Sequence, residues 1–166
     1  MTINESFLLA PWADYHYSAD RRWWNYYGEM ISERFQGEMY TVDKKVPEEM
    51  PNVKYVEGFN DEKGRHGLCT EYFRICNGCS SGHAAINLAY HLGYTSIVLL
   101  GFDLGGGHWF KESFRPSECR VESPYTAMSH ALAQMVEDLE AEGIEVVDCS
   151  PRGKIGLPYT PVEDVL

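Results

Sequence analysis

The chain has 166 residues, of which 44% are hydrophobic and 13% aromatic, and it carries a formal net charge of −11 with a pI near 4.9. This size and composition predict one domain, residues 1–166, built around one core. The negative charge would repel phosphate backbones, so we expect no nucleic-acid partner. No apolar run reaches the roughly 18 residues that a membrane span requires, and no signal-peptide pattern is present, so we expect a cytoplasmic protein without a membrane partner.

The N-terminal part alternates short apolar runs with polar turns. We expect a strand ending at Asn4, a helical turn to Ala10 and a second strand over 14–19. Asp20 is a typical N-cap for the helix after it. That helix carries an aromatic cluster, which we expect to pack against the sheet; a stacking surface for a base or a sugar ring is the alternative. The cluster consists of Trp23, Trp24, Tyr26 and Tyr27.

Two further short strands are expected over 39–42 and 53–56, separated by a polar, proline-containing loop over 43–50. The segment 57–70 is rich in turn residues and charge, and it predicts a mobile loop of the kind that often borders a binding site.

The segment 72–110 predicts one βαβ crossover: strand, small-residue loop, buried helix, buried strand and glycine-rich loop. Ser80 or Ser81 can cap the helix, and Gly82 allows a backbone or a ligand to approach its N-terminus, which favours anions. Gly93 ends the helix. The run Ile97–Leu100 lacks polar alternation and predicts a strand covered on both faces.

Asp103 and His108 follow this strand, at the position where open α/β sheets bind ligands. His108 is the expected general base, because imidazole titrates near neutrality, and Asp103 is its companion in a catalytic pair. Structural hydrogen bonds are the alternative role for both residues. Lys111 is a local cation that can offset the charge of a phosphate.

Five cysteines fit a reducing compartment better than a disulfide framework. Cys76 and Cys79 form a C-x-x-C pair close to Cys69 and His83, which raises a zinc site or a redox pair as hypotheses. A second zinc knuckle and a suitable proline are both lacking, so buried or loop thiols are favoured. We expect neither a metal nor a cofactor.

The C-terminal part predicts a helix over 124–142 capped by Ser123 and ended by Gly143. A strand over 144–149 then returns by a second crossover, and a helical turn over 162–166 closes the chain. The expected inner face of the helix consists of Met128, Ala131, Leu132, Met135, Val136 and Leu139.

Three stretches carry a resemblance to a known family: Cys79-Ser-Ser-Gly-His-Ala-Ala-Ile-Asn-Leu-Ala-Tyr-His-Leu-Gly, Ile97-Val-Leu-Leu-Gly-Phe-Asp and His108-Trp-Phe. They resemble a group of phage and prophage proteins, which are similar in turn to the Rossmann-like domain of bacterial sialyltransferases and of archaeal 6-hydroxymethylpterin diphosphokinase-like proteins. This resemblance implies one Rossmann-like, three-layer α/β domain with a mostly parallel sheet. It also implies host cytoplasm as the location if the chain is phage-encoded.

In the sialyltransferases, a Thr-Ser-Gly loop and an asparagine contact the cytidine nucleotide of the donor sugar. The matching positions here are Ser80, Ser81, Gly82 and Asn4, and the expected ligand-binding set also includes Asn77, Gly101 and Lys111. The relatives begin with one more strand and a Gly-x-Gly-Pro-Ser-type loop, which this sequence lacks. Pairing of the sheet edge left exposed would give a homo-oligomer.

The sequence favours a nucleotide or nucleotide-sugar binding protein whose catalytic activity is open. The first alternative is a metal-independent glycosyltransferase that uses a CMP- or other nucleotide-activated sugar. The second is a structural or assembly protein without catalysis.

Overall fold

The computed structural model describes residues 1–59, 67–76, 80–104, 123–151, 153 and 155–165. It is a mixed α/β protein in which every described strand pair is parallel. The strands are β1 (Thr2–Ile3), β2 (Tyr15–Tyr17), β3 (Glu38–Thr41), β4 (Val53–Tyr55), β5 (Glu57–Phe59), β6 (Arg74–Cys76), β7 (Ser96–Leu99) and β8 (Glu145–Asp148). The helices are η1 (Asn4–Leu8), α1 (Arg21–Arg34), α2 (Val46–Glu49), α3 (Ser81–His91), α4 (Ser123–Ala141) and η3 (Val162–Asp164).

The strands form three short sheets: β1-β2-β3-β4, β5-β6 and β7-β8. β8 returns parallel to β7 after α4, with Ile97 opposite Val146, in agreement with the crossover expected before this last strand. The expected βαβ crossover around α3 is only partly right. β6 pairs with β5 and β7 pairs with β8, so the strands before and after α3 belong to different sheets.

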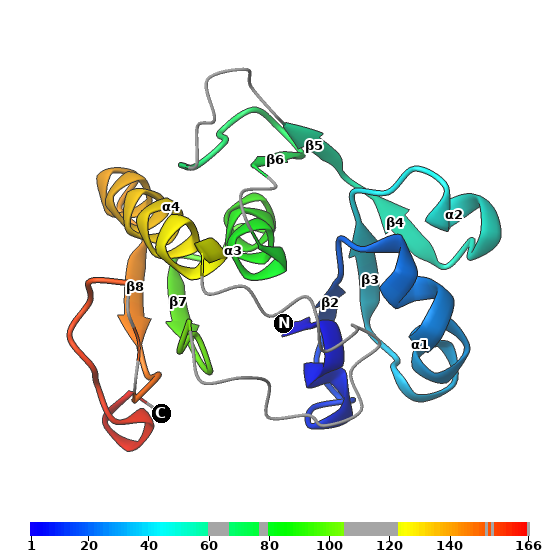
Figure 1. Ribbon diagram of the computed structural model, residues 1–166, viewed down its shortest axis with the longest axis horizontal. Helices are drawn as coiled ribbons and strands as arrows, with labels where there is room; N and C mark the ends of the chain where they lie inside the picture. Colours follow the sequence, from blue (N-terminus) through cyan, green and yellow to red (C-terminus); the bar gives the residue numbers. More distant parts are fainter. Residues whose placement is uncertain (60–66, 77–79, 105–122, 152, 154, 166) are drawn as a thin grey trace.

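Helices cover both faces of the four-stranded sheet. Successive residues of a strand point to opposite sides of the sheet, so each face packs against a different helix. Met39 packs with Trp23 and Ile31 of α1, whereas its neighbour Tyr40 belongs to a cluster with Leu88 of α3. Figure 1 shows α1 and α3 on opposite sides of these strands. Trp23, Trp24 and Tyr27 are buried, which confirms that the aromatic cluster packs against the sheet, while Tyr26 is 61% exposed.

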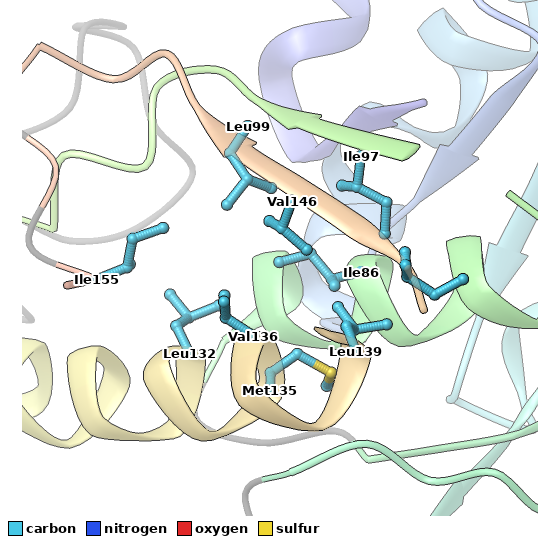
Figure 2. Close-up of a cluster of buried hydrophobic side chains, with 10 residues drawn as sticks. Ile86, Ile97, Leu99, Leu132, Met135, Val136, Leu139, Val146 and Ile155 are labelled. Carbon is cyan, nitrogen blue, oxygen red and sulfur yellow. The ribbon is translucent and has the colours of Figure 1, made fainter. Parts of the chain in front are cut away.

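A separate core lies between α4 and the β7-β8 sheet. Figure 2 shows Leu132, Val136 and Leu139 pointing from α4 toward Leu99 and Val146, and Ile86 of α3 joins the same cluster. The expected inner face of α4 is buried from Ala131 to Leu139, whereas Met128 is half-buried.

Helix ends agree with the predicted chemistry. The Asp20 carboxylate accepts a hydrogen bond from the Arg22 amide, so it caps α1 as expected. Gly93 follows the last turn of α3 with a φ of +86°, and Gly143 follows α4 with a φ of +77°. Both angles lie in the left-handed region that glycine adopts without strain.

Three expectations are wrong within the described residues. The segment 43–50 contains α2 rather than only a loop. The expected mobile loop begins as strand β5, and its residues 60–66 lie outside the described part of the chain. The strand over 97–100 is not covered on both faces, because Val98 is half-buried and Leu100 is 61% exposed.

Candidate functional site

The start of α3 is a helix end capped by a serine side chain. Ser80 has extended backbone, and its Oγ accepts a hydrogen bond from the His83 amide at 3.2 Å, which makes it the N-cap. Ser80, Ser81 and Gly82 are all half-buried, so the first turn is open to solvent on one side. The unpaired amides of such a turn and the helix dipole attract an anion. His83 is buried, with Nδ1 at 3.2 Å from the Cys76 carbonyl oxygen.

The close neighbour of Gly82 is the aromatic ring of Phe102. A Cβ added at Gly82 would lie 2.8 Å from Phe102 Cε1, closer than side chains tolerate. The absence of a side chain at Gly82 therefore makes room for this ring, whereas the sequence predicted the approach of a backbone or a ligand. The contact holds the segment after β7 against the first turn of α3.

The segment after β7 is also tied to the end of β8. The Phe102 amide donates to Ser150 Oγ at 2.8 Å, and the Ser150 amide donates to Asp148 Oδ1 at 2.9 Å. Asp148 is 1% exposed and Ser150 is fully buried. Sequence reasoning did not assign this role to them, although an Asp-Cys-Ser-Pro turn directly after a buried strand is a usable signal.

Asp103 and Gly101 lie in the same segment. Gly101 is exposed, with a φ of +76° that no other residue type adopts as readily. Asp103 is half-buried, and its Oδ1 is buried without a hydrogen-bond partner among the described residues. An unpaired buried carboxylate oxygen is costly, which makes it a reasonable functional atom.

Asn4 lies where β1 ends, and it has a positive φ of 50°. Its Oδ1 accepts a hydrogen bond from Ser18 Oγ at 2.9 Å. Because β1 and β2 are parallel, Asn4 and Ser18 lie at the carboxyl-end edge of the sheet. Asn4 and Ser18 are therefore a second polar pair at strand ends, after Asp148 and Ser150, and a hydrogen bond joins them.

The remaining expected site residues, Asn77, His108 and Lys111, lie outside the described residues. The expected pairing of His108 with Asp103 stays a prediction. The same holds for Cys79, the second half of the C-x-x-C pair.

Cys69, Cys76 and Cys149 are buried, and the sequence favoured buried or loop thiols. Burial raises the pKa of Cys149, so its reactive thiolate is disfavoured. Within the part of the chain that the structure describes, no group of three or more His, Cys, Asp or Glu side chains is arranged to hold a metal ion. The described helices also include none that is long and apolar enough to cross a bilayer.

A groove that the sequence did not predict runs between α1 and α2, with a volume of about 260 Å³. Sequence reasoning missed it because 43–50 was assigned to a loop. Pro47 followed by two glutamates in the first turn is the helix-start signal that could have found α2. The groove is lined by Trp24, Asn25, Gly28, Glu29, Ser32, Val46, Glu49 and Met50.

Comparisons with protein-family models, curated proteins and solved structures gave no match to this chain. The resemblance to sialyltransferase-like proteins therefore stays a prediction, and any function assigned to the chain depends on the geometry of its own described residues.

Proposed function

We propose that the protein binds a nucleotide or a nucleotide-sugar at the start of α3, and that its fold is a Rossmann-like, three-layer arrangement. The observation that carries the proposal is the Ser80-capped first turn, half-exposed and bordered by the segment after β7. Amides at such a turn bind a phosphate group without a charged side chain. This explains how an acidic protein can bind an anionic ligand.

Two neighbours would give the site selectivity. The Phe102 ring beside Gly82 offers a flat apolar surface against which a base or a ribose can pack. Asn4 accepts a hydrogen bond from Ser18 through Oδ1, which leaves its amide nitrogen to donate to a ligand. In this proposal, Asn4 lies on the ligand side of the sheet edge.

Support for the fold proposal comes from the parallel β1-β2-β3-β4 order and from α1 and α3 on its opposite faces. Open parallel sheets bind ligands beyond their carboxyl ends, where the polar pair Asn4 and Ser18 lies.

The glycosyltransferase alternative rests on Oδ1 of Asp103, which has no hydrogen-bond partner in the described part of the chain and lies five residues before His108 in the sequence. A carboxylate there would orient the imidazole, which would accept a proton from the acceptor hydroxyl. Incubation with CMP-sialic acid or a UDP-sugar, followed by detection of released nucleotide, tests this alternative. Loss of release in His108→Ala with binding retained would support it, whereas binding without release by the unmodified protein would contradict it.

Binding itself is tested by calorimetry with CMP, CMP-sialic acid, UDP-sugars, NAD and ADP-ribose. In Ser81→Glu the new carboxylate would occupy the anion position while still suiting the helix dipole, so we expect at least about tenfold weaker binding without loss of thermal stability. Ser81→Gln has a similar shape without charge and should bind within about threefold of the unmodified protein. If no nucleotide binds, or if Ser81→Glu binds as well as Ser81→Gln, the proposal is wrong.

A further inference from the structure

We infer that the groove between α1 and α2 is a docking site for an arginine-bearing segment of a partner protein. The groove has an apolar floor and an acidic rim, and it is distinct from the start of α3. The inference stands independently of the proposed nucleotide site.

The floor is preorganised. Trp24 is held in place by a hydrogen bond from its Nε1 to the Ser18 carbonyl oxygen at 3.0 Å, and Val46 is 1% exposed. Met50 packs directly on α1 because Gly28 lacks a side chain, and a Cβ there would lie 2.8 Å from Met50 Sδ. A thioether is polarisable and adapts to an alkyl chain laid against it.

The rim carries two carboxylates on opposite helices. Glu49 of α2 forms an ion pair with the Arg21 guanidinium, so this rim already accepts a guanidinium from the chain itself. Glu29 of α1 is exposed and has no ion-pair partner among the described residues. A second guanidinium, supplied by a partner, can therefore pair with Glu29.

The chemistry of floor and rim together selects the occupant. An anionic ligand would face the Glu29 carboxylate, whose charge no cation offsets among the described residues, whereas Glu49 is paired with Arg21. A purely apolar ligand would take water from Glu29 without replacing its hydrogen bonds. A bare metal ion would gain nothing from a tryptophan, a valine and a methionine. An arginine satisfies both parts, because its stem covers apolar surface while its guanidinium binds a carboxylate with two hydrogen bonds.

Charge and size set the strength of the contact. The net charge of −11 attracts a basic segment over long range and speeds its encounter. A groove of about 260 Å³ holds one long side chain with its adjacent backbone. We therefore expect a dissociation constant on the order of 0.1 mM for an isolated short peptide, strengthened in a longer partner.

The test is a ¹H–¹⁵N NMR titration of the full chain with the peptide acetyl-Gly-Leu-Arg-Leu-Gly-amide. We expect saturable shifts confined to the amides of residues 24–32 and 46–50. The same peptide with citrulline, which keeps the shape of arginine without its charge, should bind at least about fivefold more weakly. Equal shifts with both peptides, or shifts only elsewhere in the chain, would overturn the inference.

Three variants separate the groove from general surface charge. Glu29→Gln should weaken binding at least about fivefold, whereas Glu33→Gln, an exposed glutamate on the same helix outside the groove, should leave it within about twofold. Gly28→Ala should also weaken binding, because the added Cβ displaces Met50 into the groove. Equal weakening by Glu29→Gln and Glu33→Gln would refute the site. Free argininamide binding as tightly as the peptide would show that a small cation, not a protein segment, is the occupant.

Discussion

His16 is a fully buried histidine in the N-terminal core. Its ring stacks on Trp23 with centroids 4.9 Å apart, and Nδ1 lies 3.0 Å from Thr2 Oγ1. Thr2 Oγ1 also donates to the Tyr15 carbonyl oxygen at 3.4 Å, which favours the His16 tautomer protonated at Nδ1. Burial lowers the pKa of His16 from 6.5 to about 3, so this side chain is neutral in the folded protein.

The lowered pKa of His16 predicts acid sensitivity. Between pH 6.5 and about 3 the unfolded chain binds a proton here that the folded chain does not, so the free energy of unfolding falls as pH decreases, by up to about 1.4 kcal/mol per pH unit from this residue. Urea unfolding of the unmodified protein and of His16→Gln at pH 7, 6, 5 and 4 measures it. The unmodified protein should show the steeper loss, and equal slopes would contradict the assignment.

Asn87 is a buried amide of α3 that joins this helix to Cys69 and Cys76, which lie 18 and 11 residues before it. Its Oδ1 accepts from the amides of Cys69 and Cys76, each at 2.9 Å, and its Nδ2 donates to the Cys69 carbonyl oxygen at 2.9 Å. One side chain of α3 thus replaces the backbone pairing that a sheet would provide for these residues.

Replacement of Asn87 leaves these backbone groups without partners. Asn87→Ala should lower the free energy of unfolding by about 3 to 5 kcal/mol, because each buried group left unpaired costs about 1 to 3 kcal/mol. Urea unfolding measures this loss, and faster labelling of Cys69 and Cys76 by a thiol reagent reports the local opening. The exposed Asn25 offers a matched control, and Asn25→Ala should cost less than about 0.5 kcal/mol. Similar costs for the two variants would rule out the bridging role.

At the scale of elements, the C-terminal end of α3 depends on the backbone of Gly93. A Cβ at this position would meet nothing within 4 Å, so only the φ of +86° opposes a larger residue. Gly93→Ala should therefore lower the free energy of unfolding by about 1 kcal/mol, and Gly93→Asn by less, because asparagine tolerates the left-handed region. Thermal unfolding compares the two. An equal loss in both would point to a cause other than backbone conformation.

Most element positions were predictable because local chemistry determines them. Asp20, Ser80, Gly93 and Gly143 begin or end helices through groups within a few residues. The partition into three sheets was not predictable, since strand pairing joins distant residues and leaves no local mark. α2 was missed because four residues give too short a window for helical periodicity, which left Pro47 as its main signal.

In the candidate site too, the features set by neighbouring residues were predictable and those set by long-range contacts were not. The cap of α3 depends on its own sequence neighbours, and the sequence narrowed it to Ser80 or Ser81, of which the structure shows Ser80. The hydrogen bond from Phe102 to Ser150 crosses 48 positions, and the Asp-Cys-Ser-Pro turn marks a polar turn without indicating which distant residue it contacts. The sequence predicted that another group approaches the backbone at Gly82. It did not predict that this group is an aromatic ring, because the ring is positioned by that long-range hydrogen bond.

At the scale of the molecule, α3 connects cores that would otherwise be separate. Ile86 packs in the cluster between α4 and β7-β8, whereas Ala84, Ala85 and Leu88 pack against the four-stranded sheet. A helix buried on both sides transmits the loss of one core to the other. We therefore expect the chain to unfold as one cooperative unit, in agreement with the single domain expected from its length.

Leu139→Ala tests this cooperativity by destabilising the core between α4 and the β7-β8 sheet. Leu139 is fully buried under β7-β8, so its truncation should cost about 2 to 5 kcal/mol. Far-UV circular dichroism and tryptophan fluorescence, which reports in part on Trp23 and Trp24, should shift to the same new midpoint. A fluorescence midpoint unchanged from the unmodified protein would show that the N-terminal core unfolds on its own.

The parallel pairing of every described strand has a kinetic consequence. Parallel neighbours cannot be joined by a tight turn, so each pairing requires a crossover connection, and β7 meets β8 only after more than forty intervening residues have been arranged. Chain entropy is then lost before contacts compensate for it, which slows folding toward the millisecond-to-second range. During that interval unpaired strand edges stay open to other chains, so refolding yield should fall as the concentration of the protein rises.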